Sequence, residues 1–177
     1  MKGSLAPRII LSILATLSVA APLTACVDGE DREEGVQNMD VVRRFDEEFK
    51  NRGNRDVIDE THAADCVFHT PDPRITTRDA FKAFGASVAQ AFPDPAHGGT
   101  LVATTEDLYA NGDRVTERTS VSATHLGEFQ GVPATNKPVT WTEIHIYKFA
   151  GGEIIEQWSE VNVLGILAQI GALPGSP

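Results

Sequence analysis

The sequence has little of what metal, nucleotide and nucleic-acid binding require. No two of its 5 histidines stand at i, i+4 or at another close spacing that presets the geometry of metal ligands. No glycine-rich phosphate loop follows a predicted strand, and the Gly-x-Ser-x-Gly motif of serine esterases is absent. Lysine and arginine total 15 against 25 acidic residues, and a formal net charge of −10 repels phosphates. We therefore expect no metal, no cofactor and no nucleic-acid partner, and the missing motif disfavours an esterase.

Cysteine is also scarce, with only Cys26 and Cys66 in 177 residues. A basic start, the apolar run 9–22 and the small residues Leu-Thr-Ala precede Cys26. A run this short with these flanks indicates a secretory signal rather than a membrane-spanning helix. Leu-Thr-Ala-Cys also resembles the bacterial lipobox, which implies cleavage before Cys26 and lipid attached to its thiol. We predict a lipoprotein signal peptide over residues 1–25, with an ordinary signal peptide as the alternative.

The exported chain is expected to have two parts. Residues 26–39 are acidic and almost free of large apolar side chains, so they are predicted to form a flexible tether. Residues 40–173 have the size of one domain. If Cys26 carries lipid, Cys66 has no disulfide partner, and its apolar neighbours favour a buried structural thiol. The predicted location is the outer face of a bacterial membrane, in the cell envelope.

Helices are predicted in the first half of the domain and strands in the second. Asp40 is expected to cap a helix that Gly53 ends, a short helix follows over residues 54–62, and Thr77 caps a third. A short strand is expected near residues 66–69, and the later strands flank two turn signals, Asn111-Gly112 and Gly151-Gly152. A last short helix covers residues 164–170. Helices followed by an antiparallel sheet predict an α+β fold, a cone with helices on one face of a curved sheet and a pocket at its open end.

The final third of the domain carries a family resemblance. The pattern THLGEFQGVPATNK, then HIYKFAGGEIIEQW, then NVLGILAQIG resembles the SnoaL-like polyketide cyclase and ester cyclase family, within the nuclear-transport-factor-2-like superfamily. The resemblance implies a cone-shaped α+β barrel, commonly a homodimer, that closes a ring in a polyketide ester without metal or cofactor. In that family an acidic residue on the last strand moves the proton. In this sequence, the two positions where that acidic residue usually stands hold Ser159 and Asn162 instead.

The glycine pair predicts how the last two strands face each other. With Gly151-Gly152 as a two-residue loop, the residue numbers of each directly opposed pair add up to 303. The predicted pairs are His145 with Trp158, Glu143 with Glu160, and Trp141 with Asn162. One face is then aromatic and ionisable, which suits a ligand pocket. Two alternatives stay open: the two glutamates point into water, or a β-bulge swaps the faces and Ser159 and Gln157 supply the polar groups.

These patterns give a candidate site for a small apolar molecule. The predicted catalytic residues, which move protons, are Glu143, His145 and Glu160. The predicted substrate-binding residues are His69, His125, Phe129, Trp141, Trp158 and Asn162. His125 has no orienting partner nearby except Glu128, which favours a pocket wall or a loop anchor over a reagent.

We predict a membrane-anchored, SnoaL-like protein that acts as a cofactor-independent cyclase or isomerase on a small apolar carbonyl compound. The alternative is a lipoprotein that binds a small ligand in the same fold without catalysis. A third interpretation is an interaction module whose sheet face mediates dimerisation.

Overall fold

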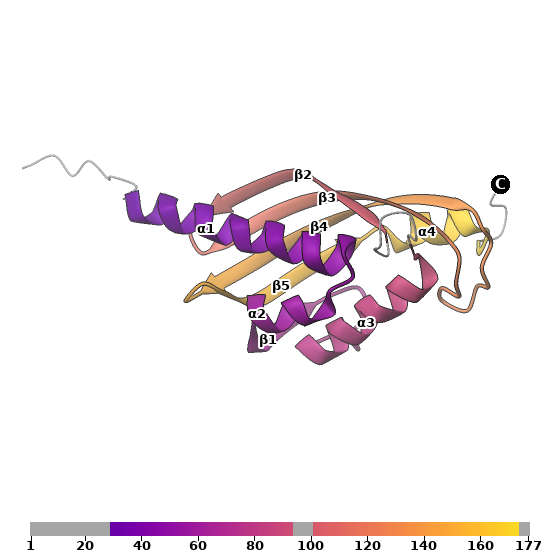
Figure 1. Cartoon of the computed structure of the whole chain (residues 1–177), viewed down its shortest axis with the longest axis horizontal. Helices are drawn as coiled ribbons and strands as arrows, with labels where there is room; N and C mark the ends of the chain where they lie inside the picture. The colour runs from indigo at the N-terminus through magenta and orange to yellow at the C-terminus, as the bar shows by residue number, and fades with distance from the viewer. Residues whose placement is uncertain (1–28, 94–100, 174–177) are drawn as a thin grey trace, which may run out of the picture.

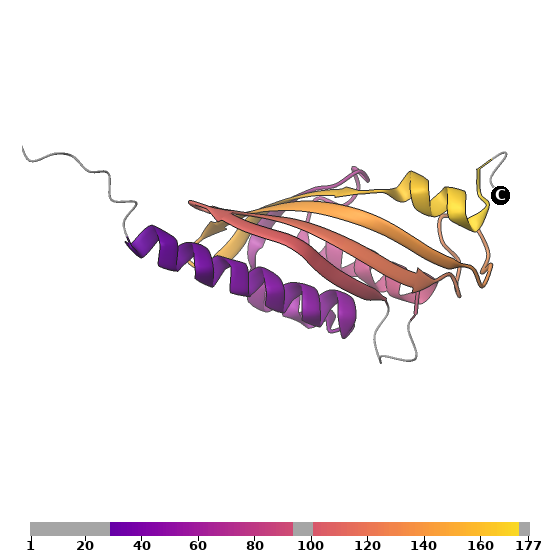
Figure 2. The same ribbon diagram turned by 90° about the horizontal axis from the view of Figure 1, so that it is seen from above.

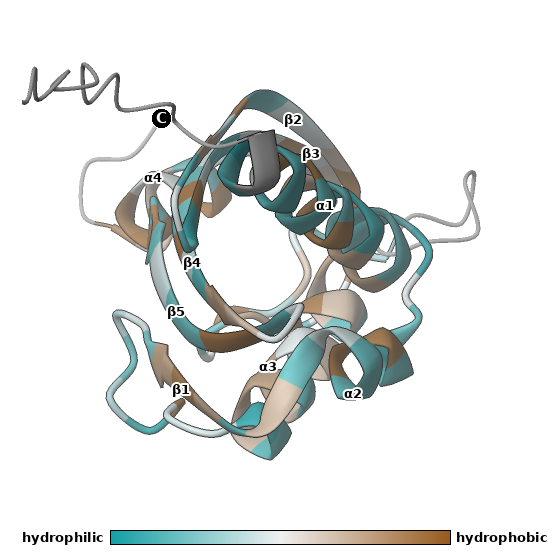
Figure 3. Ribbon diagram, turned by 90° about the vertical axis from the view of Figure 1, so that its left-hand side faces the viewer, coloured by the Kyte–Doolittle hydropathy of each residue, from teal (hydrophilic) through white to brown (hydrophobic). Residues whose placement is uncertain are grey.

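The chain folds into a curved sheet with helices against its concave side. A computed structural model describes residues 29–93 and 101–173, and both the predicted signal peptide and Cys26 lie outside these residues. α1, α2 and α3 lie on the concave side, while α4 lies at one end of the sheet (Figures 1 and 3). The elements in chain order are α1 Gly29–Asp46, a π-helical turn Glu47–Asn51, a 3-10 turn Arg55–Val57, α2 Ile58–Thr61, β1 His62–His69, α3 Arg78–Ala91, β2 Val102–Asn111, β3 Arg114–Thr124, β4 Pro138–Ala150, β5 Glu153–Val161 and α4 Val163–Ile170.

The sheet is open rather than a closed barrel. Its strand order is β1-β5-β4-β3-β2, so β1 and β2 form the two edges. β1 runs parallel to β5, and every other neighbouring pair is antiparallel. The α+β prediction is confirmed, with strong curvature producing the cone without closure (Figure 3). None of the helices in the described ranges is long and apolar enough to cross a membrane.

α1 begins earlier than the sequence indicated. Asp40 does not cap it, because the helix already starts at Gly29, inside the segment expected to be a tether. The early turns pack against β2, where an added Cβ on Gly35 would lie 3.1 Å from Cβ of Ala110 (Figure 2). Asn38, one turn later, is also buried. A polar, acidic stretch therefore forms helix because tertiary contacts along β2 outweigh its weak local preference.

Both hairpins form, and each contains a bulge: β2 shifts register between Thr105 and Asp107, and β5 shifts register beside its turn. The first turns one residue later than expected, at Gly112-Asp113, because Asn111 pairs with Arg114. The second turns at Gly151-Gly152, whose φ angles of 60° and 83° require glycine-like freedom. Ala150 pairs with Glu153 and Phe149 with Ile154, as predicted, but Lys148 then pairs with Glu156. Ile155 is therefore an extra residue, and the rest of β5 is shifted by one position.

The shift reverses the predicted faces of β5. His145 pairs with Ser159 instead of Trp158, and Glu143 pairs with Val161 instead of Glu160. Ser159, Gln157 and Val161 consequently lie on the concave side beside the inward-facing residues of β4. The structure thus follows the alternative in which a β-bulge swaps the faces, and the face that is swapped is that of β5.

The core divides into two apolar clusters along the concave side. One joins α1, β1 and the hairpin end of β4, and includes Phe45, Phe49 and Phe68. The other joins the end of α3, the loop after β3 and α4, and includes Phe92 and Trp141. The space between these clusters is where the sequence-predicted pocket would have to lie.

Candidate functional site

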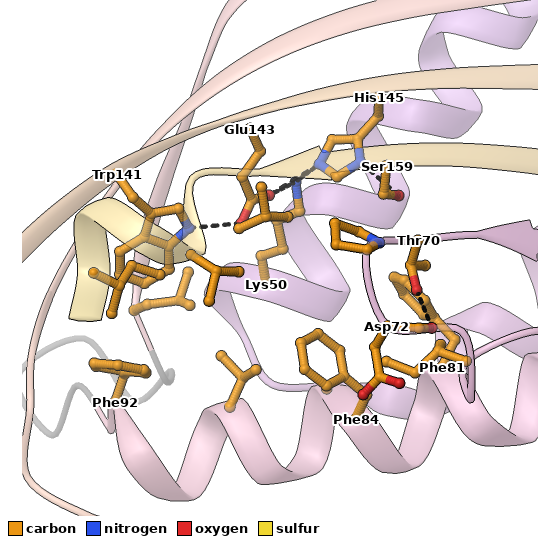
Figure 4. Close-up of a pocket in the computed structure, with 18 of the residues that line it drawn as sticks. Lys50, Thr70, Asp72, Phe81, Phe84, Phe92, Trp141, Glu143, His145 and Ser159 are labelled. Atoms are coloured by element: carbon orange, nitrogen blue, oxygen red, sulfur yellow. Dashed lines mark hydrogen bonds and ion pairs between the residues drawn. The ribbon is translucent and has the colours of Figure 1, made fainter. Parts of the chain in front are cut away.

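A cavity of about 410 Å³ lies between the two clusters. Its walls are mainly apolar and aromatic, with side chains from both clusters: Phe45, Phe49, Phe81, Phe84, Val88, Phe92, Leu101, Phe129, Trp141, Ile166 and Leu167. In Figure 4 the phenylalanines of α3 form its floor and the side chains of β4 hang from its roof. A largely apolar cavity with a few convergent polar groups is the usual form of a small-molecule site.

The polar groups gather where β4 and β5 face the π-helical turn that follows α1. Glu143 and His145 project from β4, Ser159 and Gln157 from β5, and Lys50 reaches them from the opposite side (Figure 4). Short π-helical segments occur often at functional sites, since the extra residue per turn re-aims a side chain. Here the π-helical turn directs Lys50 toward β4.

Lys50 is the positive centre of this polar group. Its Nζ lies 3.1 Å from Oδ1 of Asp46 and 3.1 Å from Oε2 of Glu143. Burial favours the neutral amine, but the carboxylates of Asp46, Glu143 and Glu117 outweigh it and raise the pKa of Lys50. The ammonium therefore stays charged and can stabilise a negative oxygen on a bound molecule.

Glu143 is held as a carboxylate by three donors. Trp141 Nε1 donates to Oε1 at 2.8 Å, while His145 Nε2 lies 2.9 Å and Lys50 Nζ 3.1 Å from Oε2. Burial opposes ionisation, yet Lys50 and His145 outweigh it and hold the pKa of Glu143 well below its usual range. Such a carboxylate orients its partners but is a weak base.

His145 links this carboxylate to a chain of hydrogen bonds through β5. Its Nε2–H donates to Glu143, and its Nδ1 lies 2.9 Å from Oγ of Ser159. Gln157 Nε2 donates to the same Oγ at 2.9 Å, and Gln157 Oε1 accepts from His62 Nε2 at 3.0 Å. Because Nε2 carries the hydrogen of the neutral ring, Nδ1 can only accept, so the Ser159 hydroxyl donates to Nδ1 while its oxygen accepts from Gln157.

His62 is the fully buried end of this chain. It packs against Phe45 and Phe68, and burial lowers its pKa to about 4 despite the hydrogen bond to Gln157. A neutral His62 fixes the orientation of the Gln157 amide. His62 therefore acts on the site through Gln157 rather than by touching the cavity.

A second layer of ionisable groups lies behind Lys50. Burial raises the pKa of Asp46. Lys50 opposes this rise, while neighbouring Glu117 adds to it. Burial also opposes ionisation of Glu117, but its interactions with Asp46 and Lys50 lower its pKa to about 2. Tyr147 donates to Glu117 Oε2 at 3.1 Å and Thr105 donates to Oε1 at 2.9 Å. Asp46 and Glu117 thus form an acidic pair directly behind the buried lysine.

Three predicted site residues on β5 or just after it lie outside the cavity, because the bulge turns them outward. Glu160 is exposed, so it is not part of an acid/base pair with Glu143. Trp158 stacks on His69 on the outer face, with ring centroids 5.0 Å apart. His69 also forms a hydrogen bond with Glu156 on that face. The prediction that His69 and Trp158 line the pocket is wrong. Asn162 is also exposed, and its side chain caps α4 by accepting from Gly165 N at 2.9 Å.

His125 anchors a loop and does not line the cavity. Its side chain is fully buried against Phe92, and Nδ1 lies 3.0 Å from Oγ1 of Thr135 across the loop. Backbone bonds tie the same loop to α3, since Leu126 N and Gly127 N both donate to Ala91 O at 3.0 Å. The predicted substrate-binding role of His125 therefore does not fit the structure, and of the two interpretations left open its contacts fit the loop anchor rather than the pocket wall.

Two other predicted binding residues do line the cavity. Phe129 packs edge-on against Phe92, and Trp141 is buried beside the same ring. Cys66 is a buried free thiol whose pKa burial raises to about 12, as expected of a structural cysteine. No group of three or more His, Cys, Asp or Glu side chains within the described ranges is arranged to hold a metal ion.

The sequence interpretation missed Lys50, Asp46 and Glu117. A signal for the first two was present: Asp46 and Lys50 stand four residues apart, each directly after a core phenylalanine. No local sequence signal indicated that Glu117 lies at the site. It alternates with its neighbours as any residue of β3 does, so the pattern could have assigned it to either face of the sheet.

A curved open sheet with helices on its concave side and one mostly apolar cavity defines the class of small α+β cone proteins. The model of the SnoaL-like polyketide cyclase family matches residues 40–170, and the chain belongs to that family. It is 26% identical over 137 residues to aklanonic acid methyl ester cyclase DnrD of Streptomyces peucetius, covering 75% of this chain and 90% of that protein.

Solved structures agree with this membership. A protein from Jannaschia sp. CCS1 assigned to the SnoaL-like polyketide cyclases superposes with a TM-score of 0.68 at 26% identity, covering 79% of this chain and 95% of that one. IdmH of Streptomyces antibioticus superposes with a TM-score of 0.66 at 28% identity, covering 76% of this chain and 99% of that one.

Proposed function

We propose that the protein is a cofactor-independent cyclase that removes a proton from a carbon next to a carbonyl group and closes a ring in a small apolar substrate. The observation that carries this proposal is the meeting of Lys50 and His145 at one polar end of an apolar cavity of about 410 Å³. The similarity to an aklanonic acid methyl ester cyclase supports the same chemistry.

In this proposal His145 receives the proton. Glu143 is a weak base because Lys50 and His145 hold its pKa low, which leaves the imidazole of His145 as the general base of the site. Since Nε2–H of His145 donates to Glu143, the free lone pair is on Nδ1, where the Ser159 hydroxyl lies. The substrate proton passes to Oγ of Ser159 as the hydroxyl proton passes to Nδ1.

Lys50 stabilises the product of that step. Removing the proton leaves an enolate, whose negative oxygen needs a positive charge in a site with little water. Lys50 and Ser159 both line the cavity, so the cation and the hydroxyl that relays the proton can reach one bound substrate. The enolate carbon then attacks a second carbonyl of the same molecule, which closes the ring by aldol addition.

The proposal is tested with heptane-2,6-dione, a small diketone that can close a six-membered ring. Proton exchange in D₂O and ring closure are followed by NMR for the protein and its variants. We expect His145→Asn and Lys50→Met to lower both rates at least about 10-fold, as loss of a general base or an oxyanion stabiliser does. His69→Asn on the outer face is the matched control and should leave both rates unchanged.

Two results would count against catalysis. Rates that do not respond to His145→Asn and Lys50→Met would remove the proposed site. Saturable binding of the diketone with no exchange above the buffer rate would instead select the ligand-binding alternative.

We also propose, from the sequence, that lipid on Cys26 holds the protein at a membrane. α1 starts at Gly29, so only two residues lie between it and Cys26, a span of at most about 10 Å. The anchor would thus hold the start of α1 close to the lipid surface, at the opposite end of the molecule from α4 (Figure 1). Mass spectrometry of Cys26→Ser should show loss of the acyl groups, and an unmodified wild-type Cys26 would overturn the proposal.

A further inference from the structure

Ser159 lies in an arrangement that can activate a hydroxyl as a nucleophile. A carboxylate, an imidazole and the hydroxyl form one line: Glu143 Oε2 to His145 Nε2 at 2.9 Å, and His145 Nδ1 to Ser159 Oγ at 2.9 Å. Sets of this kind are recognised by geometry and roles rather than by sequence order or fold. Ser159 also lines the cavity, where a substrate can reach it.

The hydrogen bonds fix the direction in which the hydroxyl is polarised. Nε2–H is committed to Glu143, so the basic lone pair of a neutral His145 is on Nδ1. Gln157 donates to Oγ at 2.9 Å, which leaves the Ser159 proton aimed at that lone pair. The Gln157 amide is in turn oriented by His62 at 3.0 Å. Every side chain around Oγ therefore favours transfer of its proton to His145.

We propose that Ser159 is the nucleophile of a second activity, hydrolysis of small apolar esters through a covalent acyl-enzyme. Oγ attacks the ester carbonyl carbon while its proton moves to Nδ1 of His145. Lys50 stabilises the negative oxygen of the tetrahedral intermediate. When the ester C–O bond breaks, the leaving alkoxide takes the proton from Nδ1 and departs as an alcohol. Water then attacks the acyl group, gives its proton to Nδ1, and Oγ recovers that proton as the carboxylic acid leaves.

This activity does not depend on ring closure. It uses the same cavity, but its intermediate is a bond to Ser159 and its product is an acid and an alcohol. The missing Gly-x-Ser-x-Gly motif disfavours an esterase whose serine lies on a strand-to-helix turn; here the activating groups come from across the sheet instead.

The test measures covalent labelling as well as turnover. The protein is treated with an ethyl fluorophosphonate, and the modified residue is found by peptide mass spectrometry. Hydrolysis of p-nitrophenyl acetate is followed in parallel. We expect one label, on Ser159, and a fall in hydrolysis of at least about 100-fold in both Ser159→Ala and His145→Ala, as loss of a nucleophile or its base causes.

Three controls make the test decisive. Ser122→Ala changes an exposed serine on β3 and should be labelled and active like the wild type. Ser159→Cys keeps a nucleophile of similar size and should still form an acyl-enzyme with p-nitrophenyl acetate, visible as an added acetyl mass. Circular dichroism confirms that each variant is folded.

The outcomes separate the two activities. A folded protein that takes no label at Ser159, or a Ser159→Ala variant that hydrolyses the ester at the wild-type rate, overturns this inference whatever happens with heptane-2,6-dione. Labelling at Ser159 together with unchanged diketone chemistry in Lys50→Met supports the acyl-enzyme and removes the proposed cyclase.

Discussion

His145 and Ser159 are direct partners across β4 and β5, with Nδ1 and Oγ 2.9 Å apart. They are partners only because Ile155 is an extra residue in β5, since an unbulged hairpin would place Trp158 opposite His145. A single bulge near the turn thus decides which side chains of β5 enter the cavity. Bulges commonly re-aim side chains next to active sites.

Lys50→Met should destabilise the protein strongly. Lys50 is buried between Asp46 and Glu143, and removing one partner of a buried ion pair leaves an uncompensated charge. Such changes cost about 3 to 5 kcal/mol of unfolding free energy. Urea unfolding measures the loss. Lys82→Met, which breaks surface pairs with Asp56 and Asp59, is the control and should change the midpoint little. Equal effects of the two substitutions would contradict the buried role of Lys50.

His62 should make the protein sensitive to mild acid. Its pKa falls from 6.5 in the unfolded chain to about 4 in the fold because burial disfavours the charged ring. Between these values the unfolded chain binds the extra proton, so stability rises with pH across this window. The stability linked to a neutral His62 is fully present above pH 6.5 and is lost as pH falls to 4. The free energy of unfolding changes by about 3 kcal/mol across this window.

Urea unfolding at several pH values checks this slope. His62→Gln should flatten the part of the pH dependence that lies between pH 4 and 6.5, although it lowers stability at pH 7 by removing packing. An identical slope in wild type and His62→Gln would show that another group titrates in this window.

The two tryptophans should report on opposite faces of the sheet. Trp141 lines the cavity and Trp158 lies on the outer face, and they are the 2 tryptophans of the chain. In Trp158→Phe, addition of 2-acetylnaphthalene should change the fluorescence of Trp141 until the site saturates. In Trp141→Phe, the remaining Trp158 should show no saturable change. A saturable response from Trp158 would place the ligand outside the cavity.

Much of the fold follows from local signals, and much of the site does not. Thr77 caps α3 by accepting from Ala80 N, and Gly171 ends α4 with a φ of 84°, as their residue types indicate. The inward residues of β4 also follow from simple alternation. The position of Lys50 does not, because it depends on a π-helical turn that forms where the chain packs against the sheet. The inward face of β5 depends on Ile155, which differs in no local way from a regular strand residue.

Deleting Ile155 should be tolerated, which is unusual for a residue inside a sheet. With Ile155 removed, Ile154 would still pair with Phe149 and Glu156 with Lys148, now without a bulge, so Ser159 would still face His145. We expect fluorophosphonate labelling within a few-fold of wild type and a modest loss of stability.

Deleting Trp158 is the matched control for this register. That deletion would either turn Ser159 outward or bring the Glu156 carboxylate into the place of Gln157, and both outcomes disrupt the buried network. Labelling at position 159 should be lost, with a large fall in the urea midpoint. If removal of Ile155 abolished labelling while removal of Trp158 preserved it, the bulge would not be the feature that sets the face of β5.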